Sequence, residues 1–247
     1  MIIVPQESKK LISVLGLPRS GTTIVCNIFN SMDQAFCLSV PHWTLITNPS
    51  ALRLDKTNIN FTTPESVIPQ VLAKLKKDDS LKFAGIKETF RPQDRAMRKH
   101  INRLLHADIV VFVVREPKAH YNSFKVLSKS HNRNFMPLKN MINMFNALYD
   151  TIKKHKDKSS TIILEDLCDA NNNKAISYMN SRANNMFAIN GPFKLNKTNY
   201  IYGNPKANNS NKLAKANMAT NLLLPDEIQI LNKELLPKYN EIKALYK

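Results

Sequence analysis

The sequence predicts an α/β protein with a three-layer, P-loop-type parallel sheet and helices on both faces. Short apolar runs of strand length alternate with amphipathic stretches of helix length, which is the order typical of parallel sheets. One run, Ile109–Val114 (IVVFVV), consists of β-branched residues and one phenylalanine. This composition is expected of a central strand that is buried on both faces.

The apolar pattern places four strands and six helices along the chain. The strands are expected at 11–15, 81–87, 109–114 and 161–164, and the helices at 22–30, 64–77, 94–105, 117–130, 138–155 and 225–246. Thr62 and Glu65 have capping-box spacing around Pro64, and Pro117 stands where a helix places its first residue. Residues 39–63 are predicted as a loop.

The chain is expected to form one domain over residues 1–247, because it contains no internal repeat and no clear linker. Residues 169–217 are rich in asparagine but also contain aromatic residues. We expect this region to be ordered and rich in loops.

The net charge of +17, from 36 Lys+Arg against 19 Asp+Glu, raises the question of a nucleic-acid partner. Lysines number 27 and arginines only nine. Lysine and asparagine both have A-rich codons, so a compositional bias accounts for much of the excess. Aromatic residues are not interleaved with the basic runs, as a single-strand platform would require. We therefore expect no nucleic-acid partner.

The three cysteines, Cys26, Cys37 and Cys168, are an odd number without a CxxC pair, which predicts neither a disulfide framework nor a zinc site. The first residues lack the layout of a secretory signal, and no apolar run approaches about 18 residues. We expect a cytoplasmic protein without a membrane span.

The first chemical motif, Gly16-Leu-Pro-Arg-Ser-Gly-Thr-Thr23, lies between the first strand and the first helix. Backbone N–H groups of such a loop point toward one position at the positive end of the helix dipole, where a phosphate or sulfate binds. Gly16 and Gly21 have P-loop spacing, but Thr22 replaces the P-loop lysine and the cation is Arg19. The motif predicts an anion site that differs from that of a kinase.

The second motif, Arg115-Glu-Pro-Lys-Ala-His-Tyr-Asn-Ser123, follows the most apolar strand. In P-loop nucleotide hydrolases an aspartate at the end of a strand holds Mg²⁺. Arg115 at this position instead predicts an anion site. Arg115 and Ser123 are placed to reach one phosphate at the carboxyl edge of the sheet, where open α/β sheets bind ligands.

Together the motifs resemble those of sulfotransferases that use 3′-phosphoadenosine 5′-phosphosulfate (PAPS). GLPRSGTT resembles their 5′-phosphosulfate loop, in the arginine-containing form of the bacterial and Golgi-type enzymes, and REPKAHYNS resembles their 3′-phosphate motif. Weaker similarities lie at Gly85–Glu88, Ile163–Leu167 and Tyr202–Pro205.

The resemblance implies in-line transfer of a sulfuryl group from PAPS to an acceptor hydroxyl, with carbohydrate favoured, or to an amine. The product would be 3′,5′-ADP, with no metal required. Arg19 would be catalytic, and Arg115 and Ser123 would hold the 3′-phosphate. The residues implied to contact the cofactor are Arg19, Ser20, Gly21, Thr22, Thr23, Arg115, Ser123 and Lys206.

An acceptor hydroxyl must lose its proton, so we expect a base near the sulfur. Glu88, after the second predicted strand, stands where the family places its base or a neighbouring residue. His42 is the alternative base, and its neighbour Trp43 is a candidate for stacking on the acceptor. A basic stripe, either a solvated face or a docking strip for an acidic acceptor, comprises Arg91, Arg95, Arg98, Lys99 and Arg103.

Two other functions remain open at this point. One is a P-loop nucleotide kinase, for which the motifs supply neither the lysine nor the Mg²⁺ aspartate. The other is a non-catalytic basic domain that binds anions or nucleic acid, for which the support is the net charge.

Overall fold

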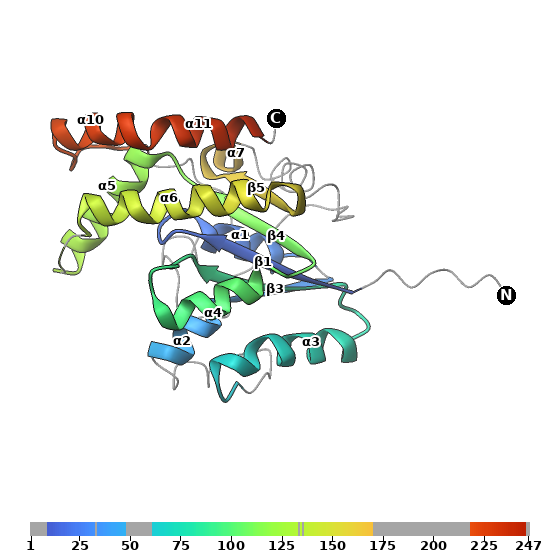
Figure 1. The fold of residues 1–247 in the computed structure, drawn as a ribbon. Helices are drawn as coiled ribbons and strands as arrows, with labels where there is room; N and C mark the ends of the chain where they lie inside the picture. The colour runs from blue at the N-terminus through green and yellow to red at the C-terminus, as the bar shows by residue number, and fades with distance from the viewer. Residues whose placement is uncertain are drawn as a thin grey trace.

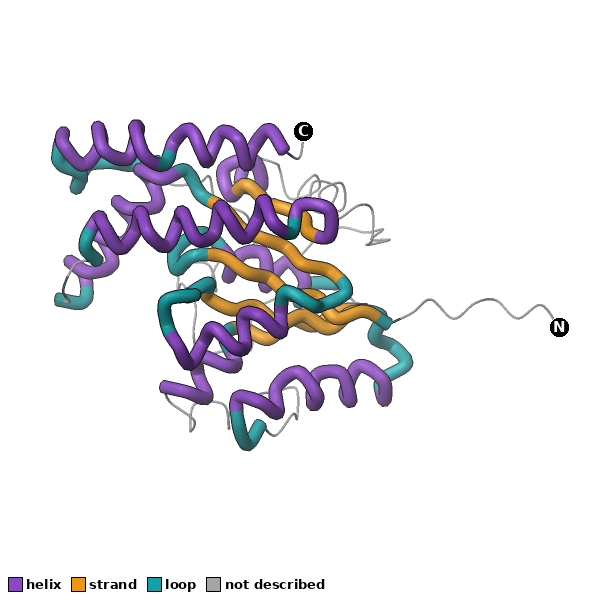
Figure 2. Tube along the Cα trace, in the orientation of Figure 1, coloured by secondary structure: helices purple, strands orange, loops and turns teal. Residues whose placement is uncertain are grey.

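The computed structural model describes residues 9–32, 34–47, 61–132, 134, 136–169 and 218–245. Five strands form one sheet in the order β2-β3-β1-β4-β5, and every neighbouring pair is parallel (Figure 1). Helices cover the sheet on both sides, which confirms the predicted fold class (Figure 2). Lys206 and most of the asparagine-rich region lie outside the described residues, and the single domain stays a prediction.

The strands agree with the prediction at the centre of the sheet and differ at its edge. Their bounds are β1 Lys10–Gly16, β2 Ala35–Ser39, β3 Phe83–Thr89, β4 Ile109–Val114 and β5 Ser159–Ile163. The prediction missed β2, because its sequence AFCLS is short and contains no β-branched residue. It also ended β3 too early, so Glu88 lies within that strand rather than after it.

The described helices are α1 Thr22–Phe29, α2 Pro41–Thr47, α3 Val67–Lys77, α4 Arg95–Leu104, α5 Pro117–Ser130, α6 Leu138–Lys154, α7 Leu164–Asp169, α10 Pro225–Glu234 and α11 Leu236–Leu245. Short 3₁₀ turns at Pro64–Ser66 and Lys156–Lys158 complete the set. None of the helices described here has the length and apolar character needed to cross a membrane.

Three helix predictions need correction. Helix α2 lies inside the segment that was predicted as a loop. The cap of the 3₁₀ turn lies one residue later than predicted, with the Thr63 N–H donating to Ser66 Oγ at 3.3 Å. The C-terminal helix is two helices, because Pro237 has no N–H to donate to the carbonyl of Lys233.

The central position of β1 follows from the direction in which the chain crosses the sheet. From β1 the chain passes through α1 to the β2 edge, and from β3 it passes through α4 to β4 on the other side of β1. Right-handed crossovers in opposite directions place their helices on opposite faces. Helix α1 accordingly packs on one buried cluster of the sheet, and α3, α4 and α6 pack on the other.

The carboxyl ends of all five strands meet at one edge of this parallel sheet. A sheet whose connections diverge from a central strand forms its ligand crevice at this edge, beside that strand. In spatial order the edge carries His42 after β2, Glu88 in β3, the loop after β1, Arg115 after β4 and Glu165 after β5. The fold therefore gathers the predicted residues from four separate parts of the chain and adds Glu165 from a fifth.

Candidate active site

The loop after β1 is held in an unusual backbone conformation. Arg19 has φ 71° and Gly21 has φ 96°, both in the left-handed region, and the Ser20 N–H donates to Leu17 O at 3.1 Å. A Cβ on Gly16 would lie 2.6 Å from both Ser20 Oγ and the Val113 carbonyl oxygen, so only glycine fits there. Left-handed residues within such a loop turn backbone N–H groups toward a common centre.

The beginning of α1 is suited to an anion. No side chain caps the helix at Gly21, and its first turn holds no acidic residue. The Ser20 side chain is fully buried, and its hydroxyl has no hydrogen-bond partner among the described residues. A buried hydroxyl without a partner costs about 1–3 kcal/mol, which a bound oxyanion would offset. The residues of this loop therefore fit a phosphate or sulfate group.

Two arginines and a serine from distant parts of the chain meet beside this loop. Arg115 Nη1 donates to the carbonyl oxygen of Arg19 at 3.2 Å, and Arg19 Nε donates to Ser123 Oγ at 3.3 Å. The first motif thus touches both ends of the second. The sequence assigned Arg19 and Ser123 to different phosphates of the cofactor, and the structure places them in direct contact.

The two arginines form a concentrated, partly desolvated positive charge. Burial lowers the pKa of Arg19, and burial is also the largest cause that lowers the pKa of Arg115. The nearby charge of Arg19 lowers the pKa of Arg115 further, while Glu165 opposes this effect. Like charges held together away from water are stabilised by a bound anion. A ligand with more than one negative group suits this place best.

His120 attaches the loop to α5. Its Nε2–H donates to the Pro18 carbonyl oxygen at 2.6 Å, one residue before Arg19. The side chain is 1 % exposed, and its ring stacks on Phe124 at a centroid distance of 5.4 Å. Burial is the main cause that lowers the pKa of His120 to about 3, and Arg115 and Arg19 add to it. The ring is therefore neutral at physiological pH and serves as a fixed donor.

Glu165 supports Arg115 from the other side. Its Oε1 accepts from the Glu116 N–H at 3.2 Å, and its Oε2 accepts from Tyr239 Oη at 3.1 Å. Burial raises the pKa of Glu165, while the charge of Arg115 acts in the opposite direction. Tyr239 lies in α11, so the C-terminal helix is connected to the residue that follows β4.

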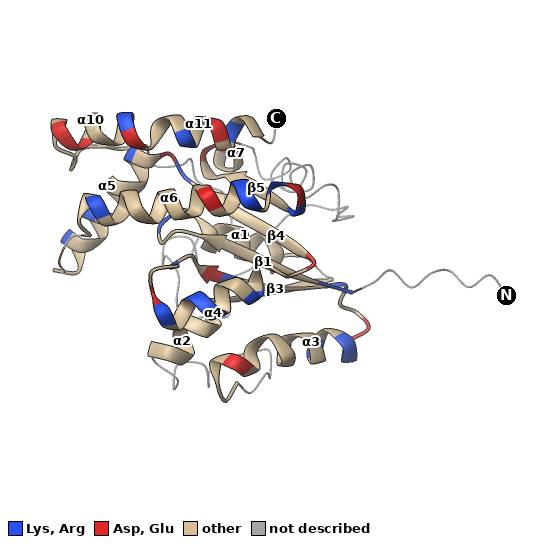
Figure 3. Ribbon diagram, in the orientation of Figure 1, with Lys and Arg blue, Asp and Glu red and all other residues tan. Residues whose placement is uncertain are grey.

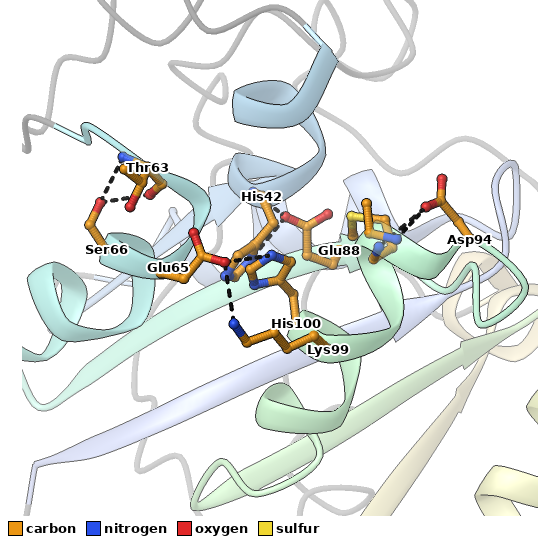
Figure 4. A network of polar contacts seen from close by, with 10 residues as sticks. His42, Thr63, Glu65, Ser66, Glu88, Asp94, Lys99 and His100 are labelled. Carbon is orange, nitrogen blue, oxygen red and sulfur yellow. Dashed lines mark hydrogen bonds and ion pairs between the residues drawn. The ribbon is translucent and has the colours of Figure 1, made fainter.

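Glu88 and His42, the two candidate bases, lie in contact (Figure 4). Glu88 Oε1 accepts from the His42 backbone N–H at 2.6 Å and lies 3.2 Å from His42 Nδ1. Glu88 is 0 % exposed, and its other oxygen, Oε2, has no hydrogen-bond partner among the described residues. One carboxylate oxygen is therefore anchored, and the second is buried without a partner among the described residues.

The backbone before His42 is strained. Val40 has φ 51°, which is a rare conformation for a β-branched residue, and its N–H donates to Lys87 O at 2.7 Å. Strain of this kind persists only where the surroundings impose it, often at functional sites. Here the bend directs the His42 N–H onto Glu88.

The contacts of His42 continue to the surface through α4. The rings of His42 and His100 stack at a centroid distance of 4.6 Å, and His100 Nε2 lies 4.0 Å from Glu65 Oε1 (Figure 4). Lys99 also pairs with Glu65 at 3.5 Å. Burial lowers the pKa of His100, and His42 lowers it further when charged. This histidine pair fixes α2 against α4 and holds His42 in position.

The structure brings together the predicted residues that it describes. Arg19, Ser20 and Gly21 form the loop, Thr22 and Thr23 begin α1, and the arginine and serine of the second motif lie beside them. Three residues that the structure places at the site had no role in the sequence analysis: His120, Glu165 and His100. His120 lies in the second motif and Glu165 in the weaker similarity at 163–167, but no spacing rule distinguishes a buried partner from a surface side chain.

A scan against protein-family models finds no match, and neither does a search of curated proteins. Solved structures do match. The sulfotransferase domain of the Synechococcus PCC 7002 olefin synthase aligns with TM-score 0.55 and 15% identity, over 93% of this chain and 96% of that chain. A sulfotransferase from Alicyclobacillus acidocaldarius aligns with TM-score 0.53 and 10% identity, over 97% and 96%. The chain therefore has the sulfotransferase fold.

The low pKa of His120 predicts a pH-dependent contribution to stability. Between about pH 3 and pH 6.5 the unfolded chain binds a proton that the folded chain does not. Stability should therefore fall as the pH decreases from 6.5, by up to about 1.4 kcal/mol per pH unit from this residue. In His120→Gln the free energy of unfolding should change less steeply with pH, with a slope smaller by the equivalent of up to one bound proton. Urea unfolding from pH 4.5 to 7 measures this slope. The exposed His131→Gln is the control, and identical slopes for wild type and His120→Gln would contradict the assignment.

Proposed function

We propose that the protein is a PAPS-dependent sulfotransferase. The observation that carries the proposal is the meeting of Arg19, Ser123 and Arg115 beside the left-handed loop at the beginning of α1. This arrangement suits a small nucleotide with two separate anionic groups. The fold and the two sequence motifs support the same conclusion.

In this proposal each group at the loop has a defined task. PAPS, when bound, supplies the sulfuryl group and the leaving phosphate. Arg19, the loop N–H groups and the hydroxyls of Thr22 and Thr23 would stabilise the negative charge that develops on that phosphate. Arg115 and Ser123 would hold the 3′-phosphate and fix the orientation of the nucleotide.

Glu88 would be the general base for the acceptor. Its unpartnered Oε2 would take the proton of the acceptor hydroxyl while the acceptor oxygen forms a bond to sulfur. The bond from sulfur to the phosphate oxygen breaks, and its electron pair stays on the leaving phosphate. His42, which contacts Oε1, would hold the carboxylate in place.

Ligand-dependent thermal stability tests the function directly. At a hundredfold excess over its dissociation constant, 3′,5′-ADP should stabilise the fold by about 2.7 kcal/mol, which shifts Tm by roughly 5–10 °C. 5′-ADP, without the 3′-phosphate, should shift it less. A larger shift with ATP–Mg²⁺ would favour a nucleotide kinase, and a larger shift with an oligonucleotide would favour a nucleic-acid-binding domain.

Replacing Arg115 by alanine should weaken 3′,5′-ADP binding by roughly ten- to a hundredfold, because a charge-assisted hydrogen bond contributes about 1.5–3 kcal/mol. Isothermal titration measures the change. Arg103→Ala, at an exposed position in the last turn of α4, is the matched control. Unchanged affinity in Arg115→Ala would remove this residue from the cofactor site.

Removing the Tyr239 hydroxyl should weaken 3′,5′-ADP binding by about three- to tenfold, because Glu165 then loses one of its two donors beside Arg115. Tyr149→Phe is the matched control, since its hydroxyl bonds the surface carboxylate of Glu241. Equal affinities for the two variants would show that α11 does not influence the nucleotide site.

Replacing Glu88 by glutamine should reduce sulfuryl transfer by at least about a hundredfold, in the range found for removal of a general base. Affinity for 3′,5′-ADP should stay within about threefold of the wild type. Transfer of labelled sulfuryl groups to the first acceptor found by screening glycans, phenols and amines provides the rate. Glu65→Gln, in the same group of contacts but exposed, should retain activity. Full turnover in Glu88→Gln would place the base elsewhere.

A further inference from the structure

Arg91 and Trp43 form a pair beside the proposed base. Arg91 lies two residues after the end of β3 and three after Glu88, at the carboxyl edge of the sheet. Its guanidinium carbon lies 4.3 Å from the centroid of the Trp43 ring. Trp43 is the neighbour of His42 in α2, so the pair borders the contact between His42 and Glu88.

The charge of Arg91 is not neutralised by contact. Among the residues that the structure describes, its enclosed Nε has no hydrogen-bond partner, and no acidic side chain forms an ion pair with it. The carboxylate of Asp94 caps α4 instead, accepting from the Ala96 and Met97 N–H groups at 3.0 and 3.3 Å. Glu88 Oε1 is held by His42. The charges of Asp94 and Glu88 act on Arg91 only at longer range.

A guanidinium in this state is prepared to bind an anion. Burial lowers the pKa of Arg91, as expected for a cation that has lost water without gaining a contacting counter-charge. Stacking on Trp43 restricts the side chain, which reduces the entropy lost when a ligand binds. A planar guanidinium also binds carboxylate, sulfate or phosphate with two parallel hydrogen bonds.

The position of Arg91 indicates which ligand it serves. Arg19 and Arg115 lie on the loops after β1 and β4, whereas Glu88 lies in β3 and Arg91 follows this strand, on the other side of β1. The nucleotide site already contains its own arginines. Arg91 lies instead on the side of the base, where the acceptor must be.

We propose that Arg91, held by Trp43, binds an oxyanionic group of the acceptor whose hydroxyl reaches Glu88. The acceptor is thus an acidic molecule, with a carboxylate, sulfate or phosphate near the hydroxyl that is sulfated. This inference rests on the proposed sulfotransferase function and specifies its substrate class.

Paired acceptors test the inference. Each pair consists of the same hydroxyl compound with and without one charged group: methyl glucuronide and methyl glucoside for carboxylate, and sulfated or phosphorylated glycosides and their neutral parents for the other two. Transfer from labelled PAPS should favour the acidic member of at least one pair by roughly ten- to a hundredfold in kcat/KM. The preference should disappear in Arg91→Gln and persist in Lys139→Gln, which removes a charge at an exposed position in the first turn of α6.

A second measurement does not depend on turnover. Trp43 is the only tryptophan in the chain, so its fluorescence reports on this pair alone. With 3′,5′-ADP present, the same acidic probes should change the emission of the wild type and of Lys139→Gln in a saturable way, and should leave that of Arg91→Gln unchanged. The neutral probes should have no effect.

The results distinguish failure of the proposed sulfotransferase function from failure of the role proposed for Arg91. A wild-type protein that fails to bind 3′,5′-ADP overturns the proposed function. Normal 3′,5′-ADP binding overturns only the present inference if no acidic probe gives an Arg91-dependent response, if neutral acceptors are preferred, or if Arg91→Gln keeps the acidic preference.

Discussion

The arginine side of the candidate site depends on one hydrogen bond, from His120 Nε2 to the Pro18 carbonyl oxygen. It joins two segments that are about a hundred residues apart in the chain. The contact between Arg19 and Ser123 also joins the left-handed loop after β1 to α5. Burial keeps the ring neutral despite this bond, and burial of the same region also desolvates the neighbouring Arg19 and Arg115.

Several buried polar groups of the candidate site lack hydrogen-bond partners among the described residues. Ser20 Oγ and Glu88 Oε2 are buried without a hydrogen bond among the residues that the structure describes, and so is Arg91 Nε. Each such group costs about 1–3 kcal/mol in the folded chain. Ser20 lies at the proposed cofactor site, and Glu88 and Arg91 lie on the proposed acceptor side. Figure 3 shows where the charged residues lie on the fold. Ligands that complete these hydrogen bonds would recover the cost on binding.

The sequence predicted the centre of this arrangement because its signals are local. A β-branched run identified β4, and a glycine-containing loop between a strand and a helix identified the anion site. The edge strand β2 and helix α2 were not predicted, because short segments carry weak propensities. Strand β2 is also defined by its pairing with β3, which the sequence does not reveal. Hydrogen bonds such as that from Tyr239 to Glu165 join residues of separate elements, and no periodicity or motif spacing predicts them. His42 and Glu88 were predicted as alternatives, and the fold makes them a contacting pair.

The central claim is that Arg19 and Arg115 bind two different phosphates of one nucleotide. Phosphorus NMR of bound 3′,5′-ADP tests it most directly, because the two phosphates give separate resonances. Both resonances should shift on binding to the wild type. Arg19→Ala should mainly abolish the shift of the 5′-phosphate, and Arg115→Ala that of the 3′-phosphate. A shift of only one resonance in the wild type, or the same loss from both substitutions, would contradict the account.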